Sequence, residues 1–361
     1  MLGSRETGNE TYVVELARSL GAVGDHRYLI YAQAGVDVPR ALTEEPALEV
    51  RRFKPVPSTW RLLRLYPRLL AADRTSLAHF TYIIPPRSPC PVVVTVHDVS
   101  FRRYPQFFSP RVRLVLGLLL GFSMRQARHV ITVSECSRRD IAHFYGIPAA
   151  RITVTPEAAG EQFQPRGPDE IRAVRHRYGL AERYVLAVGN VQPRKNLPRL
   201  VDAFAAVAGE VSDLQLVIAG QSAWKGSDTE AAVTAAGVQD RVRFTGYVPD
   251  CDLPALYSGA AIFSYPSLYE GFGLPALEAM ACGTATITSD RSSLPEVVGD
   301  AALTVDPTST ADLARAIHAL ISDETLQSVY SRRGLSRAGT FSWAATARAT
   351  AAIYDRVIAQ G

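Results

Sequence analysis

The chain has 361 residues, of which 47% are hydrophobic and 20% are charged, and its formal net charge is +4. This composition is typical of a globular protein, and the length exceeds the usual size of one hydrophobic core, so two domains are expected. The longest apolar run, around Leu114–Phe122, is too short to span a bilayer. The four cysteines lack the spacing of a metal site, which favours free thiols in a reducing compartment.

In the first half of the chain, short apolar runs alternate with amphipathic stretches, which predicts an α/β fold with parallel strands. Strands are expected at Arg27–Ala32, Leu77–Phe80, Val92–His97, His129–Val133 and Ile152–Val154. Helices are expected at Thr11–Leu20, Trp60–Ala72, Arg111–Gln126 and Ser137–Phe144.

The segment Gln162–Glu170 is rich in proline, glycine and charge, which predicts a linker. After it the alternation restarts, with strands expected at Tyr184–Val188, Leu214–Ala219, Val242–Phe244, Ala261–Tyr265, Ala285–Thr288 and Ala302–Val305. The predicted domains are residues 1–165 and 166–340, with a closing helix over residues 341–361 that packs back toward the first domain. Two such domains would leave a cleft at the carboxyl ends of their strands, where open α/β sheets bind ligands.

A basic turn follows the strand that ends in the second domain at Gly189–Asn190. Arg194 and Lys195 lie in this turn, and an amphipathic helix begins directly after Asn196, which is expected to cap it. A helix N-terminus favours phosphate, and the two cations would strengthen that preference. The alternative is a surface turn with ordinary basic residues.

Two glutamates separated by seven residues, Glu270 and Glu278, bracket a glycine-rich turn and a helix start. Gly271 and Gly273 leave backbone N–H groups open to a close ligand. Carboxylates accept hydrogen bonds from vicinal hydroxyls such as those of ribose, so the segment suits a diphosphate with attached sugars. That combination describes a sugar nucleotide. The alternative is a capping Glu270 and a solvated Glu278.

Two further motifs lie in the first half. His97 ends a predicted strand, at the edge where functional residues are expected, and a histidine can donate to a sugar hydroxyl or polarise a reacting group. Taken alone, a structural histidine is the better explanation. Gly8 precedes the first helix and is expected to form a phosphate-facing turn, although by itself it is no better than any glycine turn.

Charge is placed unevenly, since residues 1–165 carry 21 Lys and Arg against 14 Asp and Glu. This balance favours an anionic partner for the first half, or else a solvated arginine-rich surface. Two basic, apolar segments, residues 60–70 and residues 102–122, are able to lie on an anionic membrane without spanning it. The alternative is that their apolar faces pack into the domain core.

These segments, in this order, resemble the retaining glycosyltransferases of family 4, which have the GT-B fold of two Rossmann-like domains facing each other across a cleft. The resemblance runs through Thr7–Asn9, Thr95–Asp98, Val133–Ser137, Val188–Asn196, Phe244–Val248, Glu270–Glu278, Ser293–Glu296 and Phe341–Trp343. The glutamate pair with the Arg-Lys turn is specific to this kind of enzyme. The His-Asp motif with the Arg-Lys-Asn turn looks most like the mannosyl- and rhamnosyltransferase-like members.

The resemblance implies a catalytic set of His97, Arg194, Lys195 and Glu270. It implies a donor-binding set of Gly8, Gly189, Asn190, Tyr247, Val248, Gly271, Phe272, Gly273, Leu274 and Glu278. In these roles the two cations would hold the donor diphosphate, and Gly8 would close on it from the other domain. Glu278 would bind ribose, Tyr247 and Val248 would meet the base, and His97 would lie by the transferred sugar.

The resemblance also implies a retaining hexosyltransferase that moves mannose or a similar hexose to a glycan or lipid-linked acceptor. It implies no metal and no cofactor beyond the nucleotide-diphosphate sugar that serves as co-substrate. No nucleic-acid partner is expected, and the expected location is cytoplasmic, with peripheral contact at the inner face of the membrane. The alternatives are a non-catalytic GT-B subunit that binds a sugar nucleotide or a partner enzyme, and a sugar-nucleotide epimerase.

The chain departs from the family pattern at three places. Asn190 stands where many members have an arginine, and Thr155–Ala158 replaces a commoner Pro-Asn-Gly turn, to which no role is assigned. A Rossmann-like domain should also open with an apolar strand, and none fits before Gly8. We therefore expect the natural protein to begin upstream, with about five to ten more residues that form this strand.

Overall fold

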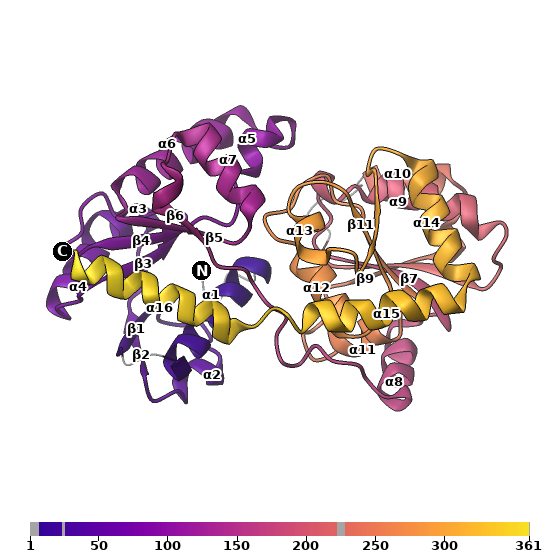
Figure 1. Ribbon diagram of the computed structural model, residues 1–361, viewed down its shortest axis with the longest axis horizontal. Coiled ribbons are helices and arrows are strands. Elements are labelled where there is room, and N and C mark those ends of the chain that lie inside the picture. Colours follow the sequence, from indigo (N-terminus) through magenta and orange to yellow (C-terminus); the bar gives the residue numbers. More distant parts are fainter. Residues whose placement is uncertain (1–6, 24–25, 222–227, 361) are drawn as a thin grey trace. The chain divides into compact units, whose positions relative to one another are not determined.

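The structure is a computed structural model that describes residues 7–23, 26–221 and 228–360. The chain divides into two compact units (Figure 1). Unit 1 comprises Met1–Ala158 and Ser342–Gly361, and unit 2 comprises Ala159–Phe341. Each unit has parallel strands and hydrophobic core clusters of its own, so each is an α/β domain of the Rossmann-like kind.

Unit 2 holds one six-stranded parallel sheet in the order β12-β11-β10-β7-β8-β9. Its strands are β7 (Arg183–Val188), β8 (Leu214–Ala219), β9 (Val242–Gly246), β10 (Ile262–Tyr265), β11 (Thr286–Ser289) and β12 (Leu303–Val305). Its helices are α8 (Pro168–Tyr178), α9 (Leu197–Ala208), α10 (Asp228–Ala235), α11 (Leu253–Ser258), α12 (Leu274–Ala281), α13 (Leu294–Val298), α14 (Thr310–Ser322) and α15 (Glu324–Ala338).

Strands β7 and β10 are neighbours in the middle of this sheet, with Ile262 opposite Val185. From β7 the chain runs outward through β8 and β9, and it then crosses back to β10 on the other side of β7. The order of the strands therefore reverses between β7 and β10. In an open α/β sheet, the carboxyl ends of the two strands at such a reversal flank the usual ligand site.

Unit 1 contains a four-stranded parallel sheet, β3-β4-β5-β6, and a separate parallel pair, β1-β2. Its strands are β1 (Tyr28–Gln33), β2 (Leu48–Phe53), β3 (Ala78–Thr81), β4 (Val92–Thr95), β5 (His129–Thr132) and β6 (Ile152–Val154). Its helices are α1 (Thr7–Val23), α2 (Arg40–Thr43), α3 (Ser58–Trp60), α4 (Tyr66–Ala72), α5 (Ser100–Arg103), α6 (Pro110–Gln126), α7 (Glu135–Tyr145) and α16 (Trp343–Ala359). A short π-helical stretch, Arg61–Leu65, joins α3 to α4.

Helix α16 belongs to unit 1 although it closes the chain, because it packs along α1. Ser342 begins it, since the Ser342 side-chain oxygen accepts a hydrogen bond from the Ala345 N–H at 3.2 Å. Trp343 lies edge-on to Tyr12 of α1, with 6.0 Å between ring centroids. The aromatic contact and the cap together fix the start of α16 against α1.

Several sequence-based predictions of elements need correction. Strand β2 was not predicted, because exposed Arg51 and Arg52 interrupt its apolar pattern. The predicted linker Gln162–Glu170 ends early, since α8 begins at Pro168. Gly8 lies in the first turn of α1 and not in a turn before it. The expected strand before Gly8 concerns residues 1–6 and upstream, which lie outside the described residues.

Candidate active site

The two cations and the first glutamate of the predicted site meet at the reversal point of the unit 2 sheet. Arg194 and Lys195 lie in a 3-10 turn, Pro193–Lys195, which follows β7. Glu270 lies in the loop between β10 and α12. Because β7 and β10 are adjacent, the turn that follows one strand faces the loop that follows the other, and the three side chains contact one another.

Both oxygens of the buried Glu270 carboxylate are bound by cations. Lys195 Nζ donates to Oε1 at 2.8 Å, and Arg194 Nη1 donates to Oε2. Burial by itself would raise the pKa of Glu270, but the neighbouring charges of Arg194 and Lys195 outweigh it and lower that pKa to about 2. Glu270 is therefore ionised at every physiological pH, and the trio carries a net positive charge that suits an anionic ligand.

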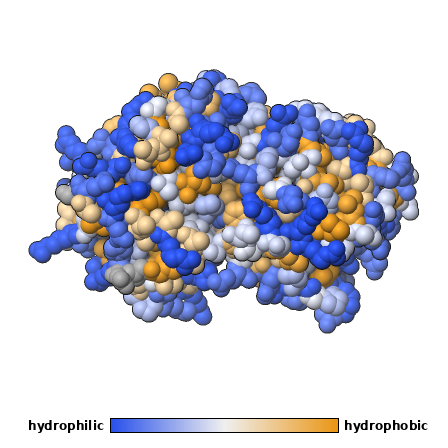
Figure 2. All heavy atoms as spheres, in the orientation of Figure 1, coloured by the Kyte–Doolittle hydropathy of each residue, from blue (hydrophilic) through white to orange (hydrophobic). Residues whose placement is uncertain are grey.

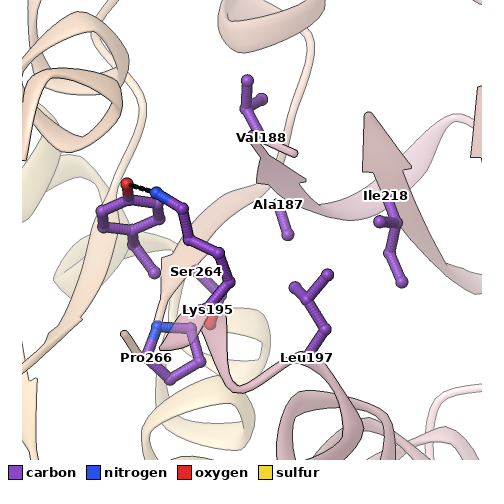
Figure 3. Close-up of a pocket in the computed structure, with 9 residues that line it drawn as sticks. Ala187, Val188, Lys195, Leu197, Ile218, Ser264 and Pro266 are labelled. Atoms are coloured by element: carbon purple, nitrogen blue, oxygen red, sulfur yellow. Dashed lines mark hydrogen bonds between the residues drawn. The ribbon is translucent and has the colours of Figure 1, made fainter. Parts of the chain in front are cut away.

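Lys195 is buried and held in place by Tyr265 of β10 and by Glu270 of the following loop. Its Nζ lies 4.4 Å from the centroid of the Tyr265 ring and donates a hydrogen bond to the Tyr265 hydroxyl, the dashed line in Figure 3. Gly189 adjoins the lysine, and its φ of +134° favours glycine, whereas a Cβ atom there would only touch Lys195 Cε, at 3.4 Å. Arg194, by contrast, keeps 26% of its side chain exposed and is accessible to a phosphate.

The glycine-rich loop after Glu270 is fixed by α13 and by the end of unit 2. Ser293 Oγ donates to the backbone oxygens of Glu270 and Phe272, at 3.0 and 2.6 Å. A Cβ atom on Gly273, whose φ is +117°, would clash with Leu294 Cδ2 at 2.5 Å. The Phe272 ring lies edge-on to Phe341 and is buried, so only the backbone of Phe272 can face a ligand.

Glu278 lies on α12, the helix that begins at Leu274, and it is buried without a cation contact in the described structure. Tyr257 donates a hydrogen bond to its Oε2 at 2.9 Å. Burial raises the pKa of Glu278 to about 7, although the Tyr257 hydrogen bond opposes part of that rise. Glu278 therefore changes protonation state near neutral pH, which Glu270 does not.

The remaining predicted residues of unit 2 differ in how they are presented. Asn190 is partly exposed just after β7, and Tyr247 is exposed after β9. Val248 is buried, so only the backbone of Val248 is available to a ligand.

The expectation that Asn196 caps α9 is wrong. Its backbone has φ of +58°, and its side chain donates instead to the carbonyls of Pro266 and Pro307, at 3.2 and 2.7 Å.

In unit 1, His97 is held in one orientation by α1 and by the segment after β3. The Asn9 side-chain oxygen lies 2.6 Å from His97 Nδ1, and because this oxygen only accepts hydrogen bonds, Nδ1 carries the proton. The rings of Tyr12 and Tyr82 stand edge-on to the imidazole, with centroids 4.5 and 5.5 Å away. Gly8, one residue before Asn9, has open space around its Cα.

Backbone strain gathers around these residues. Four non-glycine residues among those described have positive φ, and three of them contact or adjoin a candidate site residue. Tyr82 packs on His97, Asn196 follows Lys195, and Ser292 Oγ accepts a hydrogen bond from the Glu270 N–H at 2.9 Å. Such conformations persist where the surrounding structure imposes them, and they are common at functional sites.

Sequence reasoning missed the residues that hold the predicted ones in place. Tyr265 and Tyr257 lie in a strand and a helix whose apolar patterns predict only core positions. Asn9 belongs to the Thr7–Asn9 motif, but the motif assigns it no contact with a histidine. Glu157 was noted as a departure without a role, yet its carboxylate approaches His97. Proximity between distant segments is the only signal for these residues, and a single sequence does not carry it.

The described residues lack two further features, a metal-binding cluster and a membrane-spanning helix. They contain no group of three or more His, Cys, Asp and Glu side chains placed to hold a metal ion. None of their helices is both long enough and apolar enough to cross a membrane. The expectation that no metal is required therefore stays a prediction from the resemblance.

Two protein families match the two halves of the chain. The family described as Glycosyltransferase Family 4 matches residues 7–158, and the one described as Glycosyl transferases group 1 matches residues 171–337. The chain is 38% identical over 254 residues to O-antigen chain mannosyltransferase B of Escherichia coli, which covers 70% of this chain and 66% of that protein. It is 31% identical over 398 residues to mannosylfructose-phosphate synthase of Agrobacterium fabrum, and the match covers 98% of this chain and 87% of that protein.

The chain spans less than a third of the length of several other mannosyltransferases that it matches. Among solved structures, HepE of Anabaena in complex with UDP and glucose has a TM-score of 0.79 to this chain at 20% identity, covering 99% of this chain and 98% of that one. At this identity the likeness shows the fold alone, which is GT-B with two Rossmann-like domains.

Proposed function

The chain belongs to glycosyltransferase family 4, and on that premise we propose that it transfers a hexose from a nucleotide-diphosphate sugar to a glycan or lipid-linked acceptor. The observation that carries the proposal is the contact of Arg194 and Lys195 with Glu270 at the sheet reversal of unit 2. This cluster keeps a net positive charge at the usual ligand site of the fold. A diphosphate bears the complementary charge.

In the proposed reaction, the bond between the anomeric carbon and the diphosphate breaks while an acceptor hydroxyl bonds to the same carbon. The departing diphosphate gains negative charge, and Arg194 and Lys195 stabilise it because they are fixed in place before the reaction begins. Attack on the same face gives retention, and the hydroxyl proton passes to an oxygen of the leaving phosphate. Glu270 holds both cations in position and borders the transferred sugar.

Mannose is the hexose that we propose, because O-antigen chain mannosyltransferase B is among the relatives in sequence. Glu278 would accept hydrogen bonds from the ribose hydroxyls, and the loop backbone from Gly271 to Leu274 would meet the phosphates. A non-catalytic subunit is not favoured, since Arg194, Lys195 and Glu270 are all present and are bound to one another.

A thermal-shift screen against GDP-, UDP-, dTDP- and ADP-sugars tests the donor, since a ligand that binds the folded state raises its stability. We expect GDP-mannose to raise the melting temperature of the wild type and transfer to mannose-containing acceptors to follow. No shift with any of the four donors, together with no transfer, would reject the proposed function.

We also propose that transfer requires no metal ion, as the family resemblance implies. Activity should be unchanged after exhaustive treatment with EDTA and gel filtration. A loss that Mg²⁺ or Mn²⁺ restores would overturn this part of the proposal.

Finally, we propose that unit 1 binds anionic membranes reversibly through helix α6. Leu114, Val115, Leu118, Leu119 and Phe122 share its outer face and keep 40–66% of their surface exposed. Figure 2 shows apolar, orange surface in the region of α6, bordered by hydrophilic, blue surface. The basic excess of residues 1–165, which includes exposed arginines at the start of this helix, complements an anionic bilayer.

The opposite face of α6, with Leu120 and Met124, is buried, so apolar residues of this helix lie both in the core and on the surface.

Flotation with anionic liposomes at low and at high salt tests the membrane proposal. We expect binding at low salt that weakens at high salt and is lost in Leu118→Glu. No binding of the wild type at low salt would end the idea.

A further inference from the structure

A hydrogen-bond network crosses the interior of unit 1 and connects α16 to α1. The hydroxyl of Tyr354, on α16, lies 2.5 Å from Nδ1 of His79 on β3. His79 Nε2 lies 2.7 Å from the hydroxyl of Thr95 on β4, and that hydroxyl lies 3.1 Å from the hydroxyl of Tyr12 on α1. Tyr12, Thr95 and Tyr354 are buried. Four separate elements are therefore joined side chain to side chain.

His79 lies in the middle of this network and needs both of its ring nitrogens there. Burial, and to a smaller extent the neighbouring His97, lowers the pKa of His79 to about 4, so the ring is neutral at pH 7. A neutral imidazole has one donor and one acceptor nitrogen, so His79 donates to one of its two hydroxyl neighbours and accepts from the other. Removing one member would leave a buried polar group without its partner, which is costly.

The Tyr12 end of the network lies against His97. The Tyr12 ring stands edge-on to the imidazole, with 4.5 Å between centroids. Asn9, three residues earlier on the same helix, accepts a hydrogen bond from His97 Nδ1 at 2.6 Å. Tyr82, three residues after His79, places its ring 5.5 Å from the imidazole. These contacts with His97 come from α1 and from the segment after β3, and the network joins both of them to α16.

We propose that His79 and Tyr354 are positioning residues for His97, because they fix Tyr12 and the start of α1 against its imidazole. A hydrogen bond weakens steeply when its length or angle departs from the optimum, so a small rotation of a ring at a reacting sugar lowers the rate. This inference rests on the proposed function, since it takes His97 to lie by that sugar. It gives α16, which closes the chain, a role in the reaction.

Two substitutions remove parts of the network while keeping aromatic rings. Tyr354→Phe keeps the ring that lies edge-on to His79, with 5.6 Å between centroids, and removes one hydrogen bond. His79→Phe keeps a planar ring and removes two. The matched control is Tyr31→Phe, which removes a tyrosine hydroxyl of unit 1 that donates to Asp73 Oδ2 at 2.7 Å, outside the network. Each substitution is also made in the His97→Ala background.

Kinetics with GDP-mannose and mannobiose, or with whichever of the four screened donors the wild type uses, measure kcat. Tyr354→Phe lowers kcat by about twofold to tenfold, the scale for losing one hydrogen bond, and His79→Phe lowers it further. Calorimetry shows unchanged affinity for the nucleoside diphosphate of that donor. In the His97→Ala background neither substitution lowers kcat again, because the group that they position is gone. Tyr31→Phe lowers only the melting temperature.

Wild-type kcat in folded Tyr354→Phe and His79→Phe overturns the inference. A loss of kcat that persists at full size in the His97→Ala background overturns it too, because the residues would then act independently of His97. A loss that Tyr31→Phe shares would indicate a structural role alone. Should His79→Phe not fold, Tyr354→Phe decides by the same criteria. Failure of the wild type to transfer from any of the four donors rejects the proposed function, whereas a functioning wild type with unaffected variants rejects this inference alone.

Discussion

The cluster of unit 2 and the pair of His97 and Glu157 in unit 1 each bury a glutamate beside a nitrogen-containing side chain. The nitrogen groups are charged in unit 2 and neutral in unit 1. Glu270 is bound by two cations, and its pKa is lowered to about 2. His97 is neutral because burial lowers its pKa to about 4, so the nearby Glu157 does not form an ion pair with it. We expect the first arrangement to bind a charged group such as a diphosphate, and the neutral His97 to bind a neutral group such as a hydroxyl. The neighbours of a side chain, and not its type alone, therefore decide its ligand.

The largest effect should follow from removing a charge of the first arrangement. We expect Lys195→Ala and Glu270→Ala each to lower turnover by at least about a hundredfold, the scale for losing one preorganised electrostatic group. In Lys195→Ala the buried Glu270 also keeps only one of its two cations, so stability should fall. Steady-state kinetics with parallel melting curves measure both effects.

Lys54→Ala is the matched control for this test, because Lys54 is an exposed lysine of unit 1. It should leave turnover and melting temperature unchanged. Near-normal turnover in a well-folded Lys195→Ala or Glu270→Ala variant would reject the proposal that this cluster binds the donor diphosphate.

A smaller effect is expected at the neutral site. His97→Ala should lower kcat by about tenfold to a hundredfold, since it removes a hydrogen-bonding group that we place at a reacting sugar. Affinity for the nucleoside diphosphate should stay unchanged, because we propose that unit 2 binds that part of the donor. A variant that loses affinity for GDP as strongly as it loses turnover would contradict the assignment of His97 to the sugar and of unit 2 to the nucleoside diphosphate.

Glu278 offers a third case, a buried carboxylate without a cation, and it predicts a pH dependence. Its pKa is raised to about 7 by burial, so the protonated form is favoured in the folded protein without donor. We propose that Glu278 accepts hydrogen bonds from ribose hydroxyls, and its ionised form is the stronger acceptor. Donor affinity should therefore rise by about tenfold between pH 6 and pH 8, as the ionised fraction rises. Calorimetry with the donor across this range measures the effect.

The stability of the protein without donor should change in the opposite direction. A raised folded-state pKa contributes stability that is complete below the unfolded value of 4.5 and is lost as pH rises through about 7. Tyr257→Phe removes a hydrogen bond that lowers this pKa, so the midpoint of donor binding should move to higher pH. Glu278→Gln should abolish the dependence, and a wild-type affinity that is flat from pH 6 to pH 8 would exclude Glu278 as the source.

Much of the fold was predictable because its signals are local. The strand β7 is buried on both faces and appears in the sequence as a continuous apolar run, so its position was predicted to within one residue. Strand β2 lies at the edge of a two-stranded sheet, where exposed arginines remove that signal, and it was missed. Asn196 shows a further limit, since an asparagine before a helix is as compatible with a left-handed backbone as with a cap.

The candidate site was predictable only where chemistry is concentrated in one segment. The Arg-Lys turn and the glutamate pair are short motifs, and the structure brings Arg194, Lys195 and Glu270 into contact. Their burial and protonation states follow from β7 and β10 being neighbours, which depends on strands about 75 residues apart. Residues that act by proximity, such as Tyr265 and Glu157, belong to no motif and become visible only in three dimensions.

The smallest effect should come from Tyr265→Phe, which tests how finely the charged site is tuned. The substitution keeps the ring that lies 4.4 Å from Lys195 Nζ and removes only the hydroxyl that accepts a hydrogen bond from it. Loss of one such bond should lower kcat by about twofold to tenfold, while Glu270 and the ring still position the lysine. Tyr265→Leu also removes the ring, so its effect should be larger. A hundredfold loss in Tyr265→Phe alone would mean that the hydroxyl meets the substrate directly, and the charged site would then contain a neutral hydrogen-bonding group of the kind assigned here to unit 1.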